Sequence, residues 1–367
     1  PYDLFSDQLG EFLGQPGMED ACEQYLSRPR KPGTYTCMQD GSIWQQLLGP
    51  DDKPFFPKTR EEADEQSELR LGLIISLDWF NPNSSTNAPA HSTGAFTVQV
   101  ANLEPSMRSR VWNLNLGGVL PGPKEPDTEQ LAHYDREHVE DFMRLWQDGT
   151  EVITPLYPGG RRVRCAVVAI VCDHPALCKI CAFGDHAHAK FPCTKCQIHR
   201  DELSFPAPVP FPPRCGEQHK RRCARYYTLD DPKQREEYSR RYGVRWSEFC
   251  RMPYFNPVDM AIIDPMHALL LGIQAYTFLG LSRTLWFKVW ISGGKTFPGH
   301  NGKRYILRGK TENVRRELEE VHETLDTFEM PPWFGKLPKN VGYPAGGNLT
   351  SDEWRTLDIL YGPAAVS

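Results

Sequence analysis

The residue that most needs a chemical explanation is Asp78, an acid at the end of an apolar run. Residues 69–77 are rich in Leu and Ile, and the turn signal Asn81-Pro82 follows them, so the sequence predicts a buried strand here. A carboxylate that is buried without a partner is destabilising unless it becomes protonated. Asp78 therefore indicates a bound metal, a cationic partner or a position at the edge of a sheet.

The elements around Asp78 follow a regular order. Strands are predicted at residues 69–78, 94–100 and 112–120, and their short connections indicate an antiparallel meander. A helix comes next, because apolar side chains recur at helical spacing from Leu131 to Trp146, between the capping residue Asp127 and Gly149.

A second acid, Asp173, ends the nearly continuous apolar run 163–172. Such a run is typical of a strand buried on both faces, so we expect it inside the sheet and beside the first strand. Asp78 and Asp173 are then neighbours, although they lie 95 residues apart in the sequence. Two carboxylates that close repel each other, and a divalent cation usually keeps both ionised. Three strands, a helix and a further strand predict an RNase H-like α/β core.

The composition bounds the class of protein. The chain has 367 residues, of which 40% are hydrophobic and 24% charged, and its most apolar region, 260–290, is interrupted by polar side chains. We therefore expect no membrane span. The net charge of −5 argues against a uniformly basic nucleic-acid surface. Basic residues nevertheless cluster at 28–31, 161–164, 220–225 and 303–310, where they form either phosphate-binding patches or solvated loops.

The cysteines indicate metal rather than disulfides. There are eleven, an odd number, and two Cys-x-x-Cys pairs begin at Cys178 and Cys193. The chain shows no secretory signal, which favours thiolate ligands in a reducing compartment. Because the chain starts at Pro1 and stops inside a helical pattern, we expect it to be a fragment.

Five motifs carry a resemblance to a known family, and they lie at residues 77–82, 119–126, 172–176, 191–196 and 263–272. In this order they resemble transposases of CACTA (En/Spm) DNA transposons, especially the Plavaka-type elements of basidiomycete fungi. The segment 40–44 also resembles the family. The resemblance implies a nuclear DDE enzyme that acts as a homo-oligomer, cuts DNA at the terminal repeats of its element and joins the freed 3′ hydroxyl to target DNA.

The resemblance also implies which acids bind metal. Asp78 and Asp173 match the first and second acid of the family, which hold two Mg²⁺ or Mn²⁺ ions, and Glu353, with Asp352 beside it, is the best match to the third. An alternative for Glu353 is purely structural. Residues 350–353 have the S/T-x-x-E form of a capping box, in which Glu353 would only cap a helix.

The resemblance further implies a structural zinc ion bound by Cys193, Cys196 and His267, with the fourth ligand open. A rival arrangement combines Cys178 and Cys181 with the first two cysteines. We prefer the former, because Cys178 and Cys181 fall on the apolar face of a short helix, where free cysteine packs as a small hydrophobe. The possible fourth ligands are His186, His188, His199, Cys215, His219 and Cys223.

The sequence thus predicts four regions: a leader and linker at 1–68, the first part of the RNase H-like core at 69–180, a largely helical, zinc-binding insertion at 181–345, and at 346–367 the start of the helix that carries the third acid. The predicted function is a DDE-type transposase. The alternatives are an inactive, transposon-derived DNA-binding or interaction protein, and a metal-dependent nuclease without strand transfer.

Overall fold

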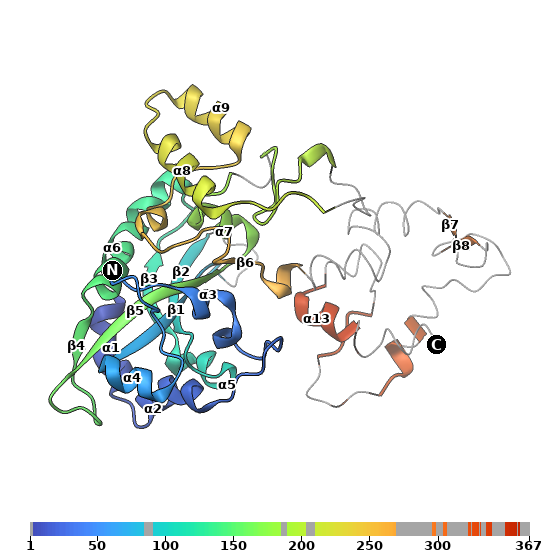
Figure 1. Cartoon of the computed structure of the whole chain (residues 1–367). Coiled ribbons are helices and arrows are strands. Elements are labelled where there is room, and N and C mark those ends of the chain that lie inside the picture. Colours follow the sequence, from blue (N-terminus) through green and yellow to red (C-terminus); the bar gives the residue numbers. More distant parts are fainter. Residues whose placement is uncertain are drawn as a thin grey trace. The chain divides into compact units, whose positions relative to one another are not determined.

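The structure is a computed structural model (Figure 1), and it divides into two compact units, Pro1–Ile263 and Asp264–Ser367. It describes residues 3–83, 91–184, 189–202, 210–268, 296–298, 304–306, 322–323, 325–329, 331, 335–339, 349–357 and 359. Each unit is treated by itself below. Among the described residues, no helix combines the length and the apolar character needed to cross a membrane.

A six-stranded sheet organises the first unit. Its strands are β1 (Glu68–Phe80), β2 (Thr93–Val100), β3 (Asn115–Leu120), β4 (Thr150–Val152), β5 (Arg161–Val171) and β6 (Ala261–Ile262). The order is β3-β2-β1-β5-β4, and β6 pairs with the other end of β5. The pairs β1–β2, β2–β3 and β4–β5 are antiparallel, whereas β1 and β6 run parallel to β5.

The sheet confirms the predicted order of strands and the mixed α/β class. The antiparallel meander is present, and the strand after the helix pairs with β1 as expected. Two differences at strand ends matter for the site. Strand β1 continues two residues beyond Asp78, and β3 starts at Asn115 because Val111–Asn113 form a turn of 3₁₀ helix, η3.

Helix α6 (Thr128–Gln147) packs on β5 and was predicted correctly (Figure 1). Its first turn is held by a capping box, since the Asp127 carboxylate accepts a hydrogen bond from the backbone N–H of Gln130 at 2.8 Å and the Gln130 side chain accepts one from Asp127 at 3.0 Å. The chain leaves the helix at Gly149, whose φ of +71° favours glycine.

The N-terminal region is part of the hydrophobic core of this unit. Helices α1 (Phe5–Leu13), α2 (Met18–Glu23) and α3 (Ser42–Gln46) bury apolar side chains that belong to the same core cluster as β1 and β5. Gly72 of β1 makes room for this packing, because a Cβ there would lie 2.6 Å from the ring of Trp44. The Trp44 ring stacks on Phe56 with centroids 3.6 Å apart.

An acidic segment within the predicted leader and linker forms helix α4 (Arg60–Gln66). Thr59 is its N-cap, because its hydroxyl oxygen accepts a hydrogen bond from the backbone N–H of Glu62 at 3.2 Å. Glu61 and Glu62 lie in the first turn, where the helix dipole favours negative charge. The run of acids is thus explained by a helix N-terminus.

Four helices and four 3₁₀ turns make up the remaining elements of the described part of the first unit. They are α5 (Pro105–Arg108), α7 (His174–Ile180), α8 (Gly216–Tyr227), α9 (Pro232–Tyr242) and the 3₁₀ turns η1 (Gln24–Ser27), η2 (Met38–Asp40), η4 (Arg200–Glu202) and η5 (Glu248–Arg251). The second unit contains the antiparallel pair β7 (Thr296–Pro298) and β8 (Arg304–Ile306), and helix α13 (Ser351–Thr356). The helices expected within 257–290 and 310–328 fall largely outside the described residues, and β6 occupies part of the former range.

Candidate active site

Asp78 and Asp173 come together at one end of the sheet. The parallel register pairs Ile75 of β1 with Ile170 of β5, and further along the backbone N–H of Leu77 donates a hydrogen bond to the Cys172 sulfur at 3.2 Å. Asp78 follows Leu77 and Asp173 follows Cys172, so the two acids occupy equivalent positions on neighbouring strands. The side-by-side pairing of the two strands that lead to these acids, predicted from the sequence, is confirmed.

Asp78 lies at the solvent-exposed end of β1, in keeping with the predicted alternative of a position at the edge of the sheet. Its side chain is exposed, and its Oδ1 accepts a hydrogen bond from the backbone N–H of Trp79 at 2.9 Å. Although β1 continues to Phe80, which pairs with Thr93 of β2, the strand has already left the core at this point. The carboxylate is therefore open to solvent.

Asp173 is the N-cap of helix α7. Its Oδ1 accepts a hydrogen bond from the backbone N–H of Ala176 at 2.7 Å, and Pro175 lies in the first turn, a position that suits proline. This half-buried acid thus has a structural role of its own. The cap uses Oδ1, which leaves Oδ2 for another ligand.

Lys179 of α7 and Glu125 of the loop before α6 adjoin this end of the sheet, and neither was predicted as a site residue. The ammonium group of Lys179, on α7, lies 5.6 Å from the ring centroid of Trp79 and 3.1 Å from the carboxylate of Glu125. Glu125 belongs to the segment 119–126, which was noted only as a motif. Its pairing with Lys179 brings the connection between β3 and α6 to the residue that follows Asp78.

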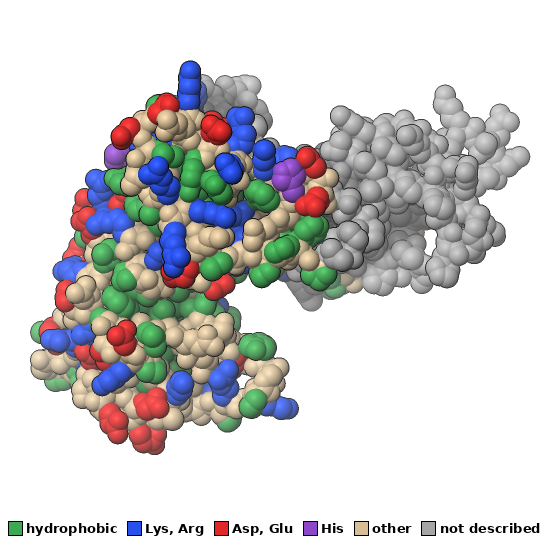
Figure 2. Space-filling model, turned by 45° about the horizontal axis from the view of Figure 1, so that its top comes forward, with side chains coloured by type: hydrophobic (Ala, Val, Ile, Leu, Met, Phe, Trp, Pro, Cys, Tyr) green, Lys and Arg blue, Asp and Glu red, His purple; other side chains and the backbone are tan. Residues whose placement is uncertain are grey.

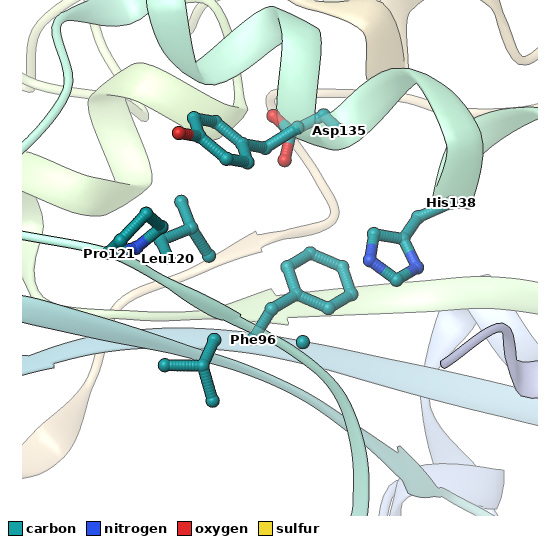
Figure 3. A pocket seen from close by; sticks show the side chains of 8 residues that line it. Phe96, Leu120, Pro121, Asp135 and His138 are labelled. Atoms are coloured by element: carbon teal, nitrogen blue, oxygen red, sulfur yellow. The ribbon is translucent and has the colours of Figure 1, made fainter. Parts of the chain in front are cut away.

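A cavity of about 350 Å³ lies between α6 and the ends of β2 and β3 (Figure 3). Helix α6 supplies Asp135 and His138, and the ring of His138 stacks on Phe96 of β2 with centroids 4.4 Å apart. Asp135 is only 2% exposed, and burial raises its pKa well above the usual value. Burial also lowers the pKa of His138 to about 4. Both side chains are therefore favoured in their neutral forms.

The Cys172 thiol is affected both by Asp135 of this cavity and by Asp78 and Asp173. Burial raises the pKa of the Cys172 thiol to about 12, and the carboxyl groups of Asp173, Asp135 and Asp78 act in the same direction when they are ionised. All three carboxyl groups thus lie within electrostatic range of one sulfur. Asp135 was missed in the sequence, although its spacing of four residues from both Leu131 and Val139 marks a charge on the apolar stripe of the helix.

The described residues contain no cluster of three or more His, Cys, Asp or Glu side chains that could hold a metal ion. Glu353 lies in the second unit, and the positions of the two units relative to one another are not determined. The capping box is formed there, since Glu353 Oε2 accepts a hydrogen bond from the backbone N–H of Thr350 at 2.6 Å, and its own N–H donates to the Thr350 hydroxyl at 3.3 Å. The structural role proposed as the alternative for Glu353 is therefore real, and its catalytic role stays a prediction.

Of the predicted zinc ligands, Cys193 and Cys196 lie together. Both are half-buried, and a hydrogen bond between the two thiols helps to raise the pKa of Cys196, mainly raised by burial. His267 lies in the second unit, where its Nδ1 contacts the carboxylate of Asp264. Cys178 and Cys181 are buried in the hydrophobic core, as we expected when we preferred the arrangement without them.

The possible fourth ligands occupy different environments. His219 is buried, and its Nε2 lies 3.2 Å from the carbonyl oxygen of Cys181. The Cys223 thiol donates to the carbonyl oxygen of Ala182 at 3.8 Å. His199 pairs with Asp201 at 3.3 Å, and Cys215 is exposed. His186 and His188 lie outside the described residues.

Comparison with known proteins points to one family. Residues 39–206 match the family model described as "Transposase family tnp2". The match includes β1, β5, both aspartates and the pair Cys193 and Cys196. No curated protein matches the chain. The match to the tnp2 model over the part of the sheet that carries Asp78 and Asp173 supports the assignment of this chain to a transposase family.

Proposed function

We propose that the chain is a DDE-type transposase that cleaves DNA at transposon ends and transfers the freed strand to a target. The observation that carries the proposal is the parallel pairing of β1 with β5, which sets Asp78 and Asp173 side by side within the region that matches the tnp2 model. The strand order, with an antiparallel meander and a parallel neighbour of β1, supports an RNase H-like core.

The donor atoms of the pair suit a hard divalent cation. Mg²⁺ and Mn²⁺ prefer carboxylate oxygens. In each aspartate Oδ1 accepts a backbone hydrogen bond, and Oδ2 is the oxygen left for the ion. When bound, a pair of such ions supplies an activated hydroxyl and stabilises the leaving oxygen. The protein's own contribution is positional. The β1–β5 pairing holds the backbone near Asp78, and the cap bond to the Ala176 N–H fixes the Asp173 carboxylate at the start of α7.

Glu353 is proposed as the third acid. In the capping box its Oε2 accepts the Thr350 N–H, so Oε1 remains for a metal ion. The two roles are compatible, because a capping carboxylate is held in one orientation. Gln satisfies a capping box as well as Glu does, so Glu353→Gln removes the charge and keeps the helix start.

We also propose a structural zinc ion held by Cys193, Cys196 and His267, with the fourth ligand open. The contact between His267 Nδ1 and Asp264 leaves Nε2 as the ligand atom, and a carboxylate on the other ring nitrogen is the usual support of a zinc-binding histidine. Membership of the CACTA group, a Plavaka-type origin, action as a homo-oligomer and a nuclear location belong to the same proposal, and the quoted motifs support them.

The decisive experiment is cleavage of labelled transposon ends by the chain in Mg²⁺ or Mn²⁺. Asp78→Asn, Asp173→Asn and Glu353→Gln should each abolish cleavage while the protein stays folded, because Asp78 is exposed and because Asn and Gln preserve the caps at positions 173 and 353. Asp231→Asn is the matched control. Asp231 caps α9 by accepting a hydrogen bond from the Lys233 N–H at 3.0 Å, so this variant should cut like the wild type. Cutting that needs no metal, or that survives Asp78→Asn, would refute the proposal.

An inactive, transposon-derived DNA-binding protein is the second candidate. The observation that favours it is that Asp173 and Glu353 both have local capping roles, which explain these acids without catalysis. Calorimetric titration with Mn²⁺ separates the two, because only the enzyme binds the ion through the three acids. A metal-dependent nuclease would cut the labelled ends without yielding joined 3′ ends.

A further inference from the structure

A second cavity, of about 380 Å³, lies next to helices α8 and α9. Its lining includes Lys190, Arg214, Arg222 and Arg241, together with His199 and Tyr242, and the lining residues include neither Asp nor Glu. We propose that this basic cavity binds a phosphate of the DNA backbone. The proposal deepens the proposed function and rests on it, because it identifies where a transposase of this structure would hold its nucleic acid.

Arg214 is fixed at the wall of the basic cavity. Its Nε donates to the carbonyl oxygen of Cys193 at 2.7 Å and its Nη2 to that of Phe191 at 2.8 Å. These neutral acceptors orient the guanidinium but do not balance its charge, and burial lowers the pKa of Arg214. A bound anion would offset this uncompensated positive charge.

Arg222 and Arg241 are held on one aromatic ring. Their guanidinium carbons lie 4.9 Å and 5.3 Å from the ring centroid of Tyr242, the last residue of α9. Gly243 follows in the left-handed conformation, with φ of +66°, and its carbonyl oxygen accepts a hydrogen bond from the Gly184 N–H at 2.9 Å. The turn after α9 is thereby tied down, which limits the freedom of both arginines.

None of the four cations that line the basic cavity pairs with a carboxylate in the part of the chain that the structure describes. Arginines elsewhere in the unit commonly do, for example Arg161 with Glu23 and Arg251 with Glu248. The net charge of this region is also opposite in sign to that of the whole chain. Residues 210–245 hold ten Lys and Arg against five Asp and Glu, whereas the whole chain holds 42 against 47. Figure 2 shows Lys and Arg side chains over the region of α8 and α9.

The arrangement matches a phosphodiester better than a carboxylate-bearing or apolar ligand. An arginine guanidinium binds phosphate oxygens with two parallel hydrogen bonds. When an unpaired cationic side chain contacts a DNA phosphate, it also releases the counterions that had condensed on the DNA, which favours binding. The cavity has room for a phosphate and part of its sugar. Because these contacts carry no sequence information, we expect the basic cavity to set affinity and position rather than specificity.

The test is binding of the full chain to a duplex DNA oligonucleotide at a series of KCl concentrations. The double variant Arg222→Gln with Arg241→Gln should bind roughly tenfold or more weakly, and the slope of log K against log [KCl] should fall in magnitude by about 1 to 2, since each lost phosphate contact contributes about 0.9. Arg162→Gln with Arg240→Gln is the control. It removes the same charge from two exposed arginines that pair with Glu151 and Glu236, and it should leave the slope unchanged.

A variant that replaces Arg222 and Arg241 with Lys separates loss of charge from loss of fold, because it should keep the salt slope of the wild type. Equal affinity and slope in the Gln variant and its control would overturn the proposal, as would an effect on RNA binding alone. Asp78→Asn makes failure of the two proposals distinguishable. This variant should lose DNA cleavage but bind DNA with the wild-type salt slope. Cleavage that survives Asp78→Asn would refute the proposed enzyme and leave the proposal for the basic cavity intact. An unchanged salt slope in the Arg222→Gln with Arg241→Gln variant would refute the proposal for the basic cavity and leave the proposed enzyme intact.

Discussion

Arg161, the first residue of β5, joins the N-terminal helix α2 to the sheet. Its Nη2 lies 2.5 Å from Glu23 Oε1 and its Nη1 lies 3.5 Å from Glu19 Oε1. The three side chains are 7%, 11% and 3% exposed, in the order Arg161, Glu23 and Glu19. We predict that Arg161→Met lowers the free energy of unfolding of the first unit by about 3–5 kcal/mol, because removal of one partner leaves buried charge uncompensated.

The loss should arise mainly from Glu19. Glu23 keeps a second cation, since Arg60 Nη1 lies 2.5 Å from its Oε2. Glu19 Oε2 accepts a hydrogen bond from the Thr154 hydroxyl, whereas its Oε1 is buried without a hydrogen-bond partner, and among the described residues Arg161 is its paired cation. Glu19→Gln in the Arg161→Met background should therefore recover about 1–3 kcal/mol.

Native-state amide hydrogen exchange in the centre of β1 and β5 measures this opening free energy directly. Exchange in Arg161→Met should be faster by a factor on the order of 100 to several thousand, since each 1.4 kcal/mol is about tenfold. The control is Arg162→Met, which removes an exposed pair with Glu151 and should change stability by less than about 1 kcal/mol. A loss of under about 1 kcal/mol in Arg161→Met, or no recovery with Glu19→Gln, would show that α2 is not held to the sheet by these charges.

Three further predictions concern the same unit. Phe142→Ala, in the core of α6, should lower stability by about 3–5 kcal/mol in the same exchange assay, and a smaller loss would mean that the site collapses around the deletion. The hydrogen bond from the Thr36 N–H, 2.8 Å from the carboxylate, together with the Arg28 guanidinium, holds the pKa of Asp40 well below its usual range. The contribution of ionised Asp40 to the free energy of unfolding is thus complete above about pH 3.9, and it is lost as the pH falls toward the pKa of the folded state. In urea unfolding measured over a series of pH values, Asp40→Asn should remove this acid-dependent loss of stability. Burial lowers the pKa of His138 to about 4, so below about pH 6.5 the unfolded state binds more protons than the folded state. As the pH is lowered from about 6.5 to about 4, the free energy of unfolding should therefore fall by up to about 1.4 kcal/mol per pH unit. The variant His138→Phe should flatten this slope.

The sequence by itself determined the elements whose signals are local. Apolar runs of strand length predicted β1 and β5, and the helical period between Asp127 and Gly149 predicted α6, because these patterns record which side chains face the core. The order of these elements also predicted that β1 and β5 are neighbours. The S/T-x-x-E pattern predicted the capping box at Glu353, which needs only residues within one turn of helix.

Only the tertiary structure decided which charges are buried, paired or solvated. Asp78 proved exposed because β1 leaves the core before its last residues, and Asp135 proved buried because α6 turns it against the sheet. The acidic run at 60–66 became a helix on the core. Arg214 and Arg241 meet at one cavity through contacts between segments distant in the sequence. Charge environments depend on such distant contacts, whereas strands and helices follow from the spacing of near neighbours.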